Sequence, residues 1–447
     1  MTEFRARRVP IHRGPAAWNA ILPAQHPPVE IESDQSADFA VVGGGFAGLS
    51  AAERLRQLNA GARIIVLEAG RLAEGASGRN SGFMIDLPHD LASEDYSGGE
   101  FDRQRRLIDL NRKAIAFAGA AVERYAVNPA YFRPVGKING AVGEKALELN
   151  AGYARKMAVL NEASEALDSR EMHEVTGTRY YAGGLYTPGT VVLQPAGYIR
   201  GFGEGLRSGV HVFENSPAVS IRRNRENWLI RTPAACVTAQ KVILANNGHL
   251  ESFGFFRHRL MHVFLFAIMT PDLGGEITRR LGGSSRWGIT PSAPMGSTVR
   301  RISGEDGGDR IIVRSCASFR PGMQATPGDL RRARRSMQRK FDRRFPALAG
   351  TRMEHAWAGH LCLSRNGVTV LRKIEDDMWA ACCQNGLGTT RGTLTGMAAA
   401  ELATGLDSEI AEFFQSEPEP ARLPPPPIST IAANVTLRWK EMRARRE

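Results

Sequence analysis

The sequence predicts an α/β protein in which a parallel-sheet domain of the nucleotide-binding type is interrupted by a second domain. Two observations predict this arrangement. A buried strand, a glycine turn, a helix and another buried strand follow one another in DFAVVGGGFAGLSAAERLRQLNAGARIIVLEAG, residues 38–70. The later strands and the last helix of such a domain appear only after residue 190. The segments between these elements leave room for an inserted domain. A chain of 447 residues is also too long for one simple hydrophobic core.

The glycine turn has the spacing of a Rossmann-type dinucleotide site. Gly43, Gly45 and Gly48 fill the pattern G-x-G-x-x-G between strand and helix. The first permits a tight turn, the second lets backbone approach a pyrophosphate, and the third lets the helix pack closely on the strand. Glu68 ends the second strand, where an acidic side chain accepts hydrogen bonds from a ribose. The unit predicts an adenine dinucleotide at the positive end of the helix.

The remaining elements follow from chain breakers and hydrophobic spacing. Prolines predict an irregular arm over residues 1–36. We expect a hairpin over Tyr131–Gly143. The expected helices cover residues 100–126, 143–175, 329–345 and the segment from Thr389 onward. The expected strands lie at 39–42, 64–67, 242–245, within 259–319 and at 378–383. A proline run then separates a short tail, residues 416–447.

Composition narrows the class of protein. Hydrophobic residues make up 43% of the chain, as in ordinary globular proteins. No apolar run approaches the ~18 residues of a membrane span, and HVFLFAIM, residues 262–269, is expected to be a core strand. The five cysteines have neither metal-site nor disulfide spacing. No apolar stretch follows the basic N-terminal arm, so we expect no export signal. These features predict a cytoplasmic protein with no metal and no membrane partner.

The net charge of +12 raises the question of a nucleic-acid partner. Much of this charge lies in DLRRARRSMQRKFDRRF, residues 329–345. Apolar residues recur there near helical spacing, so we expect the arginines on the wet face of an ordinary helix. Attraction of small anionic substrates is the second interpretation. Nucleic-acid binding is not favoured, because aromatic residues in this block are limited to Phe341 and Phe345.

Four motifs resemble one family. They are VVGGGFAGLSAAERL with the acid of VLEAG, then LAEGASGRNSGF (residues 72–83), AWAGHLCLSR (residues 356–365) and GLGTTRGTLTG (residues 386–396). Together they resemble the FAD-dependent amine oxidases of the D-amino-acid-oxidase superfamily, and gamma-glutamylputrescine oxidases most closely. The resemblance spans about residues 38–410. Relatives often have Gly-His-Gly where this chain has Gly388-Thr389-Thr390.

The resemblance implies non-covalently bound FAD and a set of residues that hold it. In GASGRNSG, the polar side chains are expected to donate to phosphates and to the flavin's polar edge. The helix after Gly388 is expected to direct its positive end at the pyrimidine edge of the ring. The expected FAD-binding residues are Gly43, Gly45, Phe46, Ala47, Gly48, Glu68, Ala69, Arg71, Ala76, Ser77, Arg79, Asn80, Ser81, Val219, Asn247, Gly248, Gly386, Leu387, Gly388, Thr389 and Thr390.

Four residues are candidates for the substrate side. Arg301 lies before a late strand of the second domain, and Arg365 ends the L-S-R segment. An arginine at either position would fork onto a carboxylate. His258 and His262 lie near the strand expected to face the flavin. For each of these residues, a structural salt bridge or a packed core position is the alternative. No residue set suggests a metal site.

The resemblance implies oxidation of the C–N bond of a small amine or amino-acid-like substrate. Hydride passes to the flavin, water hydrolyses the imine, and dioxygen regenerates the flavin with release of hydrogen peroxide. An FAD enzyme acting on a modified tRNA base, an amine dehydrogenase and a non-catalytic flavoprotein are the alternatives. The expected FAD-binding domain comprises residues 37–92, 194–250 and 351–415. The α+β substrate domain, built on an antiparallel sheet, comprises residues 93–193 and 251–350.

Overall fold

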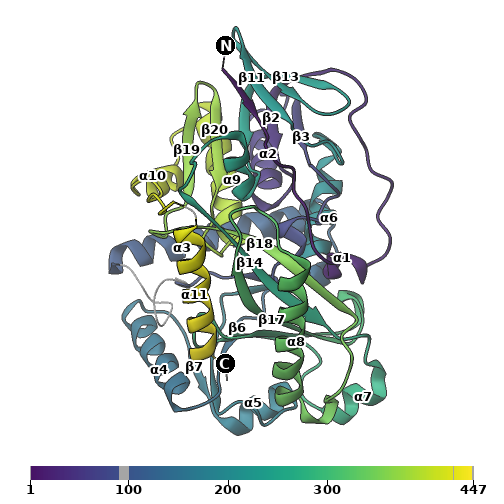
Figure 1. Cartoon of the computed structure of the whole chain (residues 1–447), viewed down its shortest axis with the longest axis vertical. Coiled ribbons are helices and arrows are strands. Elements are labelled where there is room, and N and C mark those ends of the chain that lie inside the picture. The colour runs from purple at the N-terminus through teal and green to yellow at the C-terminus, as the bar shows by residue number, and fades with distance from the viewer. Residues whose placement is uncertain (1, 90–99, 426, 445–447) are drawn as a thin grey trace.

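The computed structural model of the chain describes residues 2–89, 100–425 and 427–444. Two large sheets organise it, one in the upper half of Figure 1 and one in the lower half. A small three-stranded sheet, in the order β4-β9-β5, completes the strands. The predicted domain boundary at residues 92/93 lies outside the described residues.

The upper sheet has a parallel centre, as the glycine-turn unit predicts. Strands β10, β3, β2 and β13 pair in parallel, and β20 pairs in parallel with the last residues of β13. Antiparallel pairing joins β1, β11, β12 and β13 on one side and β19 to β20, while the parallel strand β10 forms the opposite edge. Its strands are β1 (Glu3–Arg5), β2 (Gln35–Val42), β3 (Ile64–Leu67), β10 (His211–Phe213), β11 (Ser220–Asn224), β12 (Asn227–Arg231), β13 (Cys236–Leu244), β19 (Val370–Glu375) and β20 (Met378–Cys382).

Helices bury one face of the upper sheet. Val41, Ile64 and Val66 pack against α2 (Phe46–Leu58), α9 (Thr390–Thr404), α3 (Phe101–Arg124) and α6 (Pro195–Leu206). The other face packs into a second core that includes β11 and β12. Burial on both faces explains why β2 and β3 read as continuous apolar runs. α2 and α9 approach closely, because a Cβ at Gly396 would lie 2.1 Å from the Ala47 carbonyl oxygen.

The lower sheet is antiparallel apart from the β15–β6 pair. Its strand order is β18-β14-β17-β16-β15-β6-β8-β7. Its strands are β6 (Lys137–Ala141), β7 (Glu165–Leu167), β8 (Gly183–Thr187), β14 (Leu260–Met269), β15 (Trp287–Pro291), β16 (Thr298–Ile302), β17 (Arg310–Phe319) and β18 (His355–Ser364). The small sheet comprises β4 (Phe83–Met84), β5 (Phe132–Arg133) and β9 (Val191–Leu193). The α/β class with an antiparallel second sheet is therefore confirmed.

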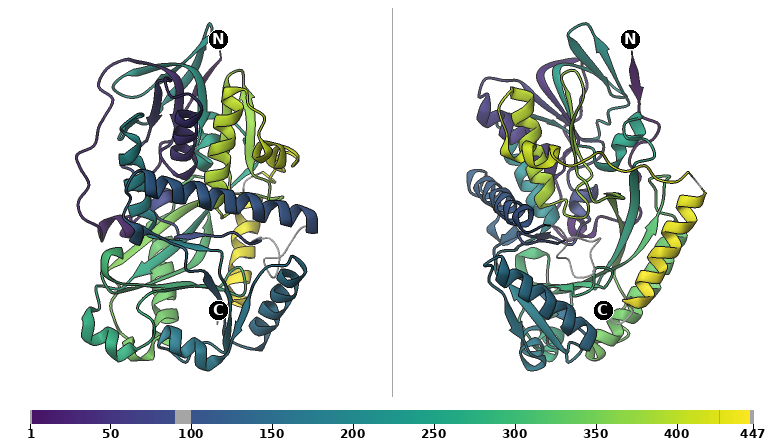
Figure 2. Two further views of the ribbon diagram at one scale, coloured as in Figure 1. Left: turned by 180° about the vertical axis from the view of Figure 1, so that it is seen from behind. Right: turned by 90° about the vertical axis from the view of Figure 1, so that its left-hand side faces the viewer.

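The remaining helices surround the lower sheet and the edges of the molecule. α3 crosses between the two halves, as the view from behind in Figure 2 shows. These helices are α1 (Ala17–Ala20), α4 (Glu144–Val159), α5 (Ser169–Thr176), α7 (Gly274–Leu281), α8 (Pro327–Arg344), α10 (Glu409–Gln415) and α11 (Ile428–Arg443). Short 3-10 turns lie at η1 (Ala76–Gly78), η2 (Pro129–Tyr131), η3 (Asn247–Phe253), η4 (Gly304–Asp306) and η5 (Pro346–Leu348).

Two local expectations were wrong. Tyr131–Gly143 is no hairpin, because β5 pairs with β9 in the small sheet while β6 pairs with β8 and β15. A link of three residues therefore carries the chain from one sheet to another. Residues 143–175 are not one helical region either: Asn161 adopts a φ of 60° after α4, and β7 then adds to the sheet beside β8.

Two strands fall outside the segments expected for their sheets. β1, within the N-terminal arm, pairs with β11 and joins the upper sheet. β18 lies in the 351–415 segment of the expected FAD-binding domain but pairs with β14 in the lower sheet. β18 therefore runs between the two halves and contributes residues to the space between them.

Candidate active site

Two adjoining cavities lie between the sheets. One is lined by the residues of the glycine turn, Glu68 and Ala218. The other extends from the same turn to Thr298 and Arg314 of the lower sheet. The cavities share lining residues from four segments, which are Gly45, Ala76, Ser77, Ala245, Asn247 and His360. The site is thus an elongated space that joins a nucleotide-type cradle to a deeper chamber.

Steric constraints fix the glycine turn. Gly43 adopts a φ of 112°, and a Cβ there would lie 2.7 Å from the Ala245 carbonyl oxygen. A Cβ at Gly48 would lie 1.7 Å from the Gly43 carbonyl oxygen, so α2 could not approach β2. Gly45 differs, because its Cβ would point at open space with Ser77 3.7 Å away. No side chain caps the N-terminus of α2. Its backbone N–H groups are thereby left to a ligand.

Glu68 is locked at the end of β3. Its carboxylate accepts hydrogen bonds from the backbone N–H groups of Gly44 (2.7 Å) and Gly70 (3.2 Å). Burial raises the pKa of Glu68, and these backbone donors act in the opposite direction. Glu68 and Ala69 both line the first cavity. Arg71 does not, since its guanidinium pairs with Glu214 at 3.1 Å.

The GASGRNSG loop folds over the cavities and divides its polar groups between two tasks. Ser77 and Ser81 line the deeper cavity. Asn80 closes the loop, donating to the Ser77 carbonyl oxygen (2.6 Å) and accepting from the Gly82 N–H (2.7 Å). Arg79 donates to the carbonyl oxygens of Glu74 and Ala358. Burial lowers the pKa of Arg79 to about 10. Its guanidinium ties the loop to β18 while one edge of the side chain lines the cavity.

Asn247 and Gly248 begin the turn after β13. Asn247 adopts a φ of 51° and lines both cavities. A Cβ at Gly248 would lie 2.8 Å from His262 Nδ1 and 2.9 Å from His360 Cε1. Gly248 is therefore needed for the packing of two histidines and is itself absent from the cavity walls among the described residues.

Both backbone polar groups of Val219 are hydrogen-bonded to other backbone groups of the protein. Its N–H donates to the Arg231 carbonyl oxygen, and its carbonyl oxygen accepts from the Ala6 N–H. Its neighbours Pro217 and Ala218 line the first cavity instead.

The last helix of the upper half presents its N-terminus to the deeper cavity. Gly386, Leu387, Gly388 and Thr389 line that cavity, and no side chain caps α9. Thr389 Oγ1 donates to the Phe83 carbonyl oxygen (2.6 Å) and Thr390 Oγ1 donates to that of Ile85 (3.2 Å). The two threonines that stand in place of His-Gly therefore anchor α9 to the segment after the GASGRNSG loop.

Basic side chains gather at the far end of the deeper cavity. Arg314 of β17 lines it, and its Nε donates to Ser81 Oγ at 3.3 Å. His89 lies in the same wall. Burial lowers the pKa of His89 well below its ordinary value, and the charges of Lys137, Arg314 and Arg391 lower it further. Burial also lowers the pKa of Lys137 to about 8. Among the described residues that line this cavity there is no carboxylate.

Three of the four predicted substrate residues lie away from this chamber. Arg301 occupies the opposite face of β16, where it donates to the carbonyl oxygens of Gly282 (2.5 Å) and Thr278 (3.3 Å) at the end of α7. Arg365 is exposed after β18. It lines a separate outer cavity, here called the outer entrance, which shares His89 and Arg314 with the chamber. His258 is exposed in the loop before β14, where its backbone N–H donates to Glu251.

His262 approaches the site through another histidine. Its Nε2 lies 2.8 Å from Glu251 Oε2, and its Nδ1 lies 3.1 Å from His360 Nε2. His360 lines both cavities and stacks on Phe264 with ring centroids 4.9 Å apart. Burial lowers the pKa of His360 well below its ordinary value. His262 thus positions His360, which faces the site.

Sequence reasoning missed Arg314, His89 and His360. Arg314 lies in DRIIVRSCASF, which was expected to be a strand, and His360 lies in one of the four motifs. Alternation along a strand separates its two faces, but it does not tell which face the chamber occupies. His89 has no regular pattern around it that would have found it.

Two kinds of feature are absent from the described ranges. No group of three His, Cys, Asp or Glu side chains there is arranged to hold a metal ion. No helix within them has the length and hydropathy needed to cross a bilayer.

Known proteins share this architecture. Glycine oxidase from Geobacillus kaustophilus superposes with a TM-score of 0.68 at 17% identity, covering 84% of this chain and 96% of that one. L-Amino acid deaminase from Proteus myxofaciens, in complex with anthranilate, gives a TM-score of 0.65 at 12% identity, covering 90% and 96%. At these identities the likeness shows the fold alone.

Sequence relatives agree with the fold. Gamma-glutamylputrescine oxidoreductase of Escherichia coli is 25% identical over 385 residues, covering 85% of this chain and 86% of that protein. A probable oxidoreductase, OrdL, of Haemophilus influenzae is 24% identical over 399 residues, covering 87% of each. The family model described as FAD dependent oxidoreductase matches residues 38–402. The chain belongs to this family of FAD-dependent oxidoreductases, also called the DAO family, as the four motifs predicted.

The residues present fit FAD. The cradle offers uncapped N-termini of α2 and α9, a glycine whose missing side chain leaves space at Gly45, and the buried carboxylate of Glu68. Backbone donors suit the diphosphate, and the carboxylate suits a ribose hydroxyl. Bound in this orientation, FAD would direct its flavin end toward Thr389 and the basic chamber.

Proposed function

We propose that the protein oxidises the C–N bond of a small amine that carries an anionic group such as a carboxylate. One observation carries the proposal: the chamber beyond the cofactor cradle is lined by Arg314 and His89 and by no described carboxylate. The positive charge of Arg314 disfavours a second cation in this chamber and favours an anion. The amine end of the substrate would face the flavin while its anionic end meets Arg314.

Arg314 is suited to orient such a substrate. Its guanidinium can fork onto both oxygens of a carboxylate, while Ser81 holds its Nε from behind. Lys137 lies near and supports the positive potential, with its Nζ held by Asn139 Oδ1 at 2.6 Å. Because Lys137 is buried and Arg314 is half-buried, their attraction for an anion is stronger than in water. A substrate fixed at one end presents its reacting carbon in one orientation.

Bound FAD supplies two-electron oxidation of the carbon beside nitrogen, after which water hydrolyses the imine and dioxygen accepts the electrons. We propose that FAD is bound non-covalently. All five cysteines are free thiols, and Cys362 is the one cysteine among the described residues that line the two cavities. Free thiols also favour a reducing, cytoplasmic compartment.

The test is an anaerobic spectral titration of the purified protein. Amines would be offered in matched pairs with and without a carboxylate, such as glycine and methylamine, or gamma-glutamylputrescine and putrescine. We expect the carboxylate-bearing partner to bleach the flavin, and peroxide to appear when air is admitted. Bleaching without peroxide would identify a dehydrogenase. Bleaching by the partners without a carboxylate alone would contradict the role of the basic chamber, and no bleaching by any amine would contradict the function.

A further inference from the structure

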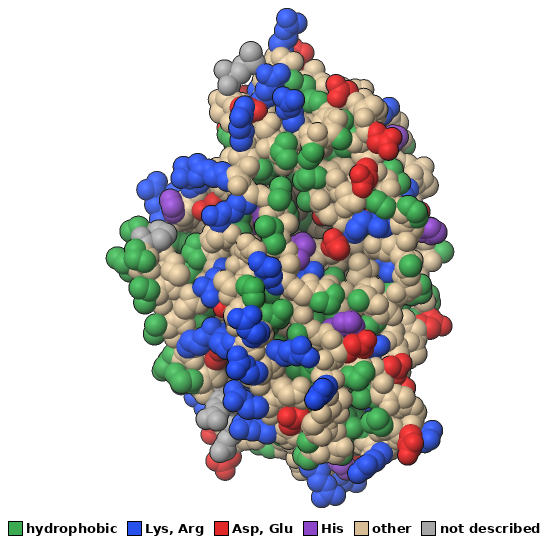
Figure 3. All heavy atoms as spheres, turned by 45° about the vertical axis from the view of Figure 1, so that its right-hand side comes forward, with side chains coloured by type: hydrophobic (Ala, Val, Ile, Leu, Met, Phe, Trp, Pro, Cys, Tyr) green, Lys and Arg blue, Asp and Glu red, His purple; other side chains and the backbone are tan. Residues whose placement is uncertain are grey.

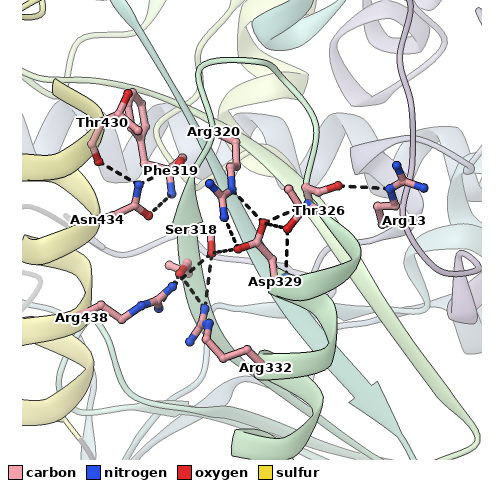
Figure 4. A network of polar contacts seen from close by, with 12 residues as sticks. Arg13, Ser318, Phe319, Arg320, Thr326, Asp329, Arg332, Thr430, Asn434 and Arg438 are labelled. Atoms are coloured by element: carbon pink, nitrogen blue, oxygen red, sulfur yellow. Dashed lines mark hydrogen bonds and ion pairs between the residues drawn. The ribbon is translucent and has the colours of Figure 1, made fainter. Parts of the chain in front are cut away.

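The C-terminal helix α11 is attached to the molecule through its polar side chains. Asn434 Oδ1 accepts from the Phe319 N–H and its Nδ2 donates to the Phe319 carbonyl oxygen, both at 3.1 Å. Glu441 Oε1 accepts from the Ala317 N–H at 2.6 Å, and Arg438 Nη1 donates to the Ala317 carbonyl oxygen at 2.9 Å. These contacts satisfy the edge of β17 beyond its pairing with β16, as Figure 4 shows for Asn434 and Arg438. One face of α11 is therefore fixed inward.

The outward face of α11 is a continuous apolar stripe. Its members follow one another at spacings of three, four, four and three residues, which is one side of an α-helix. They are Ile428, Ile431, Val435, Trp439 and Met442, with exposed fractions of 63%, 62%, 62%, 49% and 65%. Within the described residues, these are five of the fourteen large hydrophobic side chains that are exposed. Such concentration on one helix marks an interaction surface.

Basic side chains flank the stripe. α8 runs beside α11, and Arg332 of α8 reaches Glu441 of α11 at 3.5 Å. α8 also carries an exposed arginine at every fourth position, none of which has an ion-pair partner among the described residues; these are Arg331, Arg335, Arg339 and Arg343. Figure 3 shows this face, with hydrophobic side chains along the left edge and Lys and Arg side chains gathered beside them. Arg443 lies over the Trp439 ring at 4.7 Å.

We propose that α11 and the arginine face of α8 form a docking surface for the anionic surface of a phospholipid bilayer. The helix would lie in the plane of the interface with its stripe among the acyl chains and the arginines on the lipid phosphates. At about 24 Å, a helix of this length lies along a bilayer surface but is too short to span it. The sequence excluded a membrane span; this surface is a peripheral contact.

Charge favours a bilayer over a second copy of the chain. In a symmetric pairing of α11 with α11, the arginine faces of two copies approach each other and repel. An anionic bilayer instead neutralises these arginines while it buries the stripe.

The outer entrance to the site, with a cavity volume of about 810 Å³, is lined by Ala432, Thr436 and Leu437 of the same helix. Docking would therefore place this entrance close to the membrane surface.

The test is co-sedimentation of the full FAD-bound chain with vesicles. Binding is expected to vesicles of phosphatidylcholine mixed with phosphatidylglycerol, weakly or not at all to phosphatidylcholine alone, and to fall as salt is added. The double variant Ile431→Gln, Val435→Gln should lower binding roughly tenfold or more, and so should Arg335→Gln, Arg339→Gln. These positions are exposed, so retained flavin and unchanged thermal unfolding establish that each variant is folded.

Val159→Gln is the matched control, because Val159 is 68% exposed on α4 and should leave vesicle binding unchanged. The proposal is overturned if the unaltered protein fails to bind anionic vesicles, or if it binds them as well after the stripe is replaced. Light scattering tests the alternative that a second copy of the chain covers the apolar stripe. A dimer that the stripe variant dissociates, in a protein that ignores vesicles, would assign the stripe to self-association and overturn the proposal.

Discussion

Gly45 and Gly43 share a motif but serve different physical needs. Gly43 needs its glycine for the backbone itself, since its φ is positive and a Cβ would clash with the Ala245 carbonyl. At Gly45 a Cβ has space, so the absence of a side chain there benefits the ligand. A substitution at Gly43 should therefore affect stability, whereas a substitution at Gly45 should affect cofactor binding.

Gly45→Asp is expected to yield a folded but colourless protein. The new carboxylate would point at the diphosphate, and an unpaired like charge should weaken FAD binding by roughly a hundredfold or more. The flavin-to-protein absorbance ratio measures the effect. Gly61→Asp is the control, because Gly61 is exposed with no atom within 4 Å of a Cβ. Full flavin content in Gly45→Asp would refute this placement of the diphosphate.

Arg314→Met and Arg365→Met compare the arginine that lines the chamber in the structure with one that the sequence suggested. We expect a rise of about 100-fold in KM for a carboxylate-bearing amine, because the carboxylate loses its half-buried guanidinium partner. Arg365→Met, which alters an exposed side chain at the entrance, should change KM by less than about threefold. Steady-state kinetics on both variants provide the measurement. Equal effects, or the reverse order, would remove Arg314 from the substrate site.

A reciprocal capping box closes the N-terminus of α8. Thr326 Oγ1 accepts from the Asp329 N–H, and the Asp329 carboxylate accepts in return from the Thr326 N–H at 2.9 Å. Asp329 also pairs with Arg320, whose Nε lies at 2.8 Å, in the network of Figure 4. Burial raises the pKa of Asp329, but the hydrogen bonds from Arg320 and Thr326 outweigh it and hold the pKa below its ordinary value of 3.8.

The depressed pKa gives a signed prediction about pH. The folded state favours charged Asp329, so its stabilising contribution is present above about pH 4 and is lost as the pH falls further. Asp329→Asn should lower the free energy of unfolding by about 2 kcal/mol at pH 7 and flatten the acid decline. Denaturant unfolding across pH tests both. Asp407→Asn, at an exposed loop carboxylate, is the control and should change neither.

At the scale of the whole molecule, the site depends on the position of the lower sheet relative to the upper sheet, because residues of both line it. Strand β18 belongs to the lower sheet but carries Gly359 and His360 to the cradle, and the Arg79 guanidinium ties it to the GASGRNSG loop. The cofactor would fill the space between the halves and contact both. FAD binding and folding should therefore be thermodynamically linked.

Adding FAD to apoprotein is expected to raise the melting temperature steadily with its concentration. At about a hundredfold above Kd, the gain corresponds to about 3 kcal/mol. Differential scanning fluorimetry or calorimetry can follow it, with NAD as the control ligand that leaves the melting temperature unchanged. A protein stabilised by NAD and indifferent to FAD would contradict the cofactor assignment.

The cofactor cradle was predictable because its parts are close in sequence. Strand, turn, helix and acid from Phe39 to Glu68 form contacts within one βαβ unit, and their residue types are set by local backbone geometry. The strand Val242–Ala245 and the helix after Gly388 were also found, since buried strands and helix starts carry strong composition signals. The predicted helix start lies one residue from the observed start of α9, whereas β13 begins six residues before the predicted strand.

The sequence alone therefore determined the family, the nucleotide fold and most of the cradle, because these rest on short-range patterns. The tertiary structure decided which arginine faces the chamber. Arg301 and Arg314 lie on neighbouring strands, yet only Arg314 lines the cavity, since sheet packing selects the inner face. It also decided that Tyr131–Gly143 divides between two sheets and that the apolar side of α11 faces outward. Each depends on partners far away in the chain, which periodicity does not reveal.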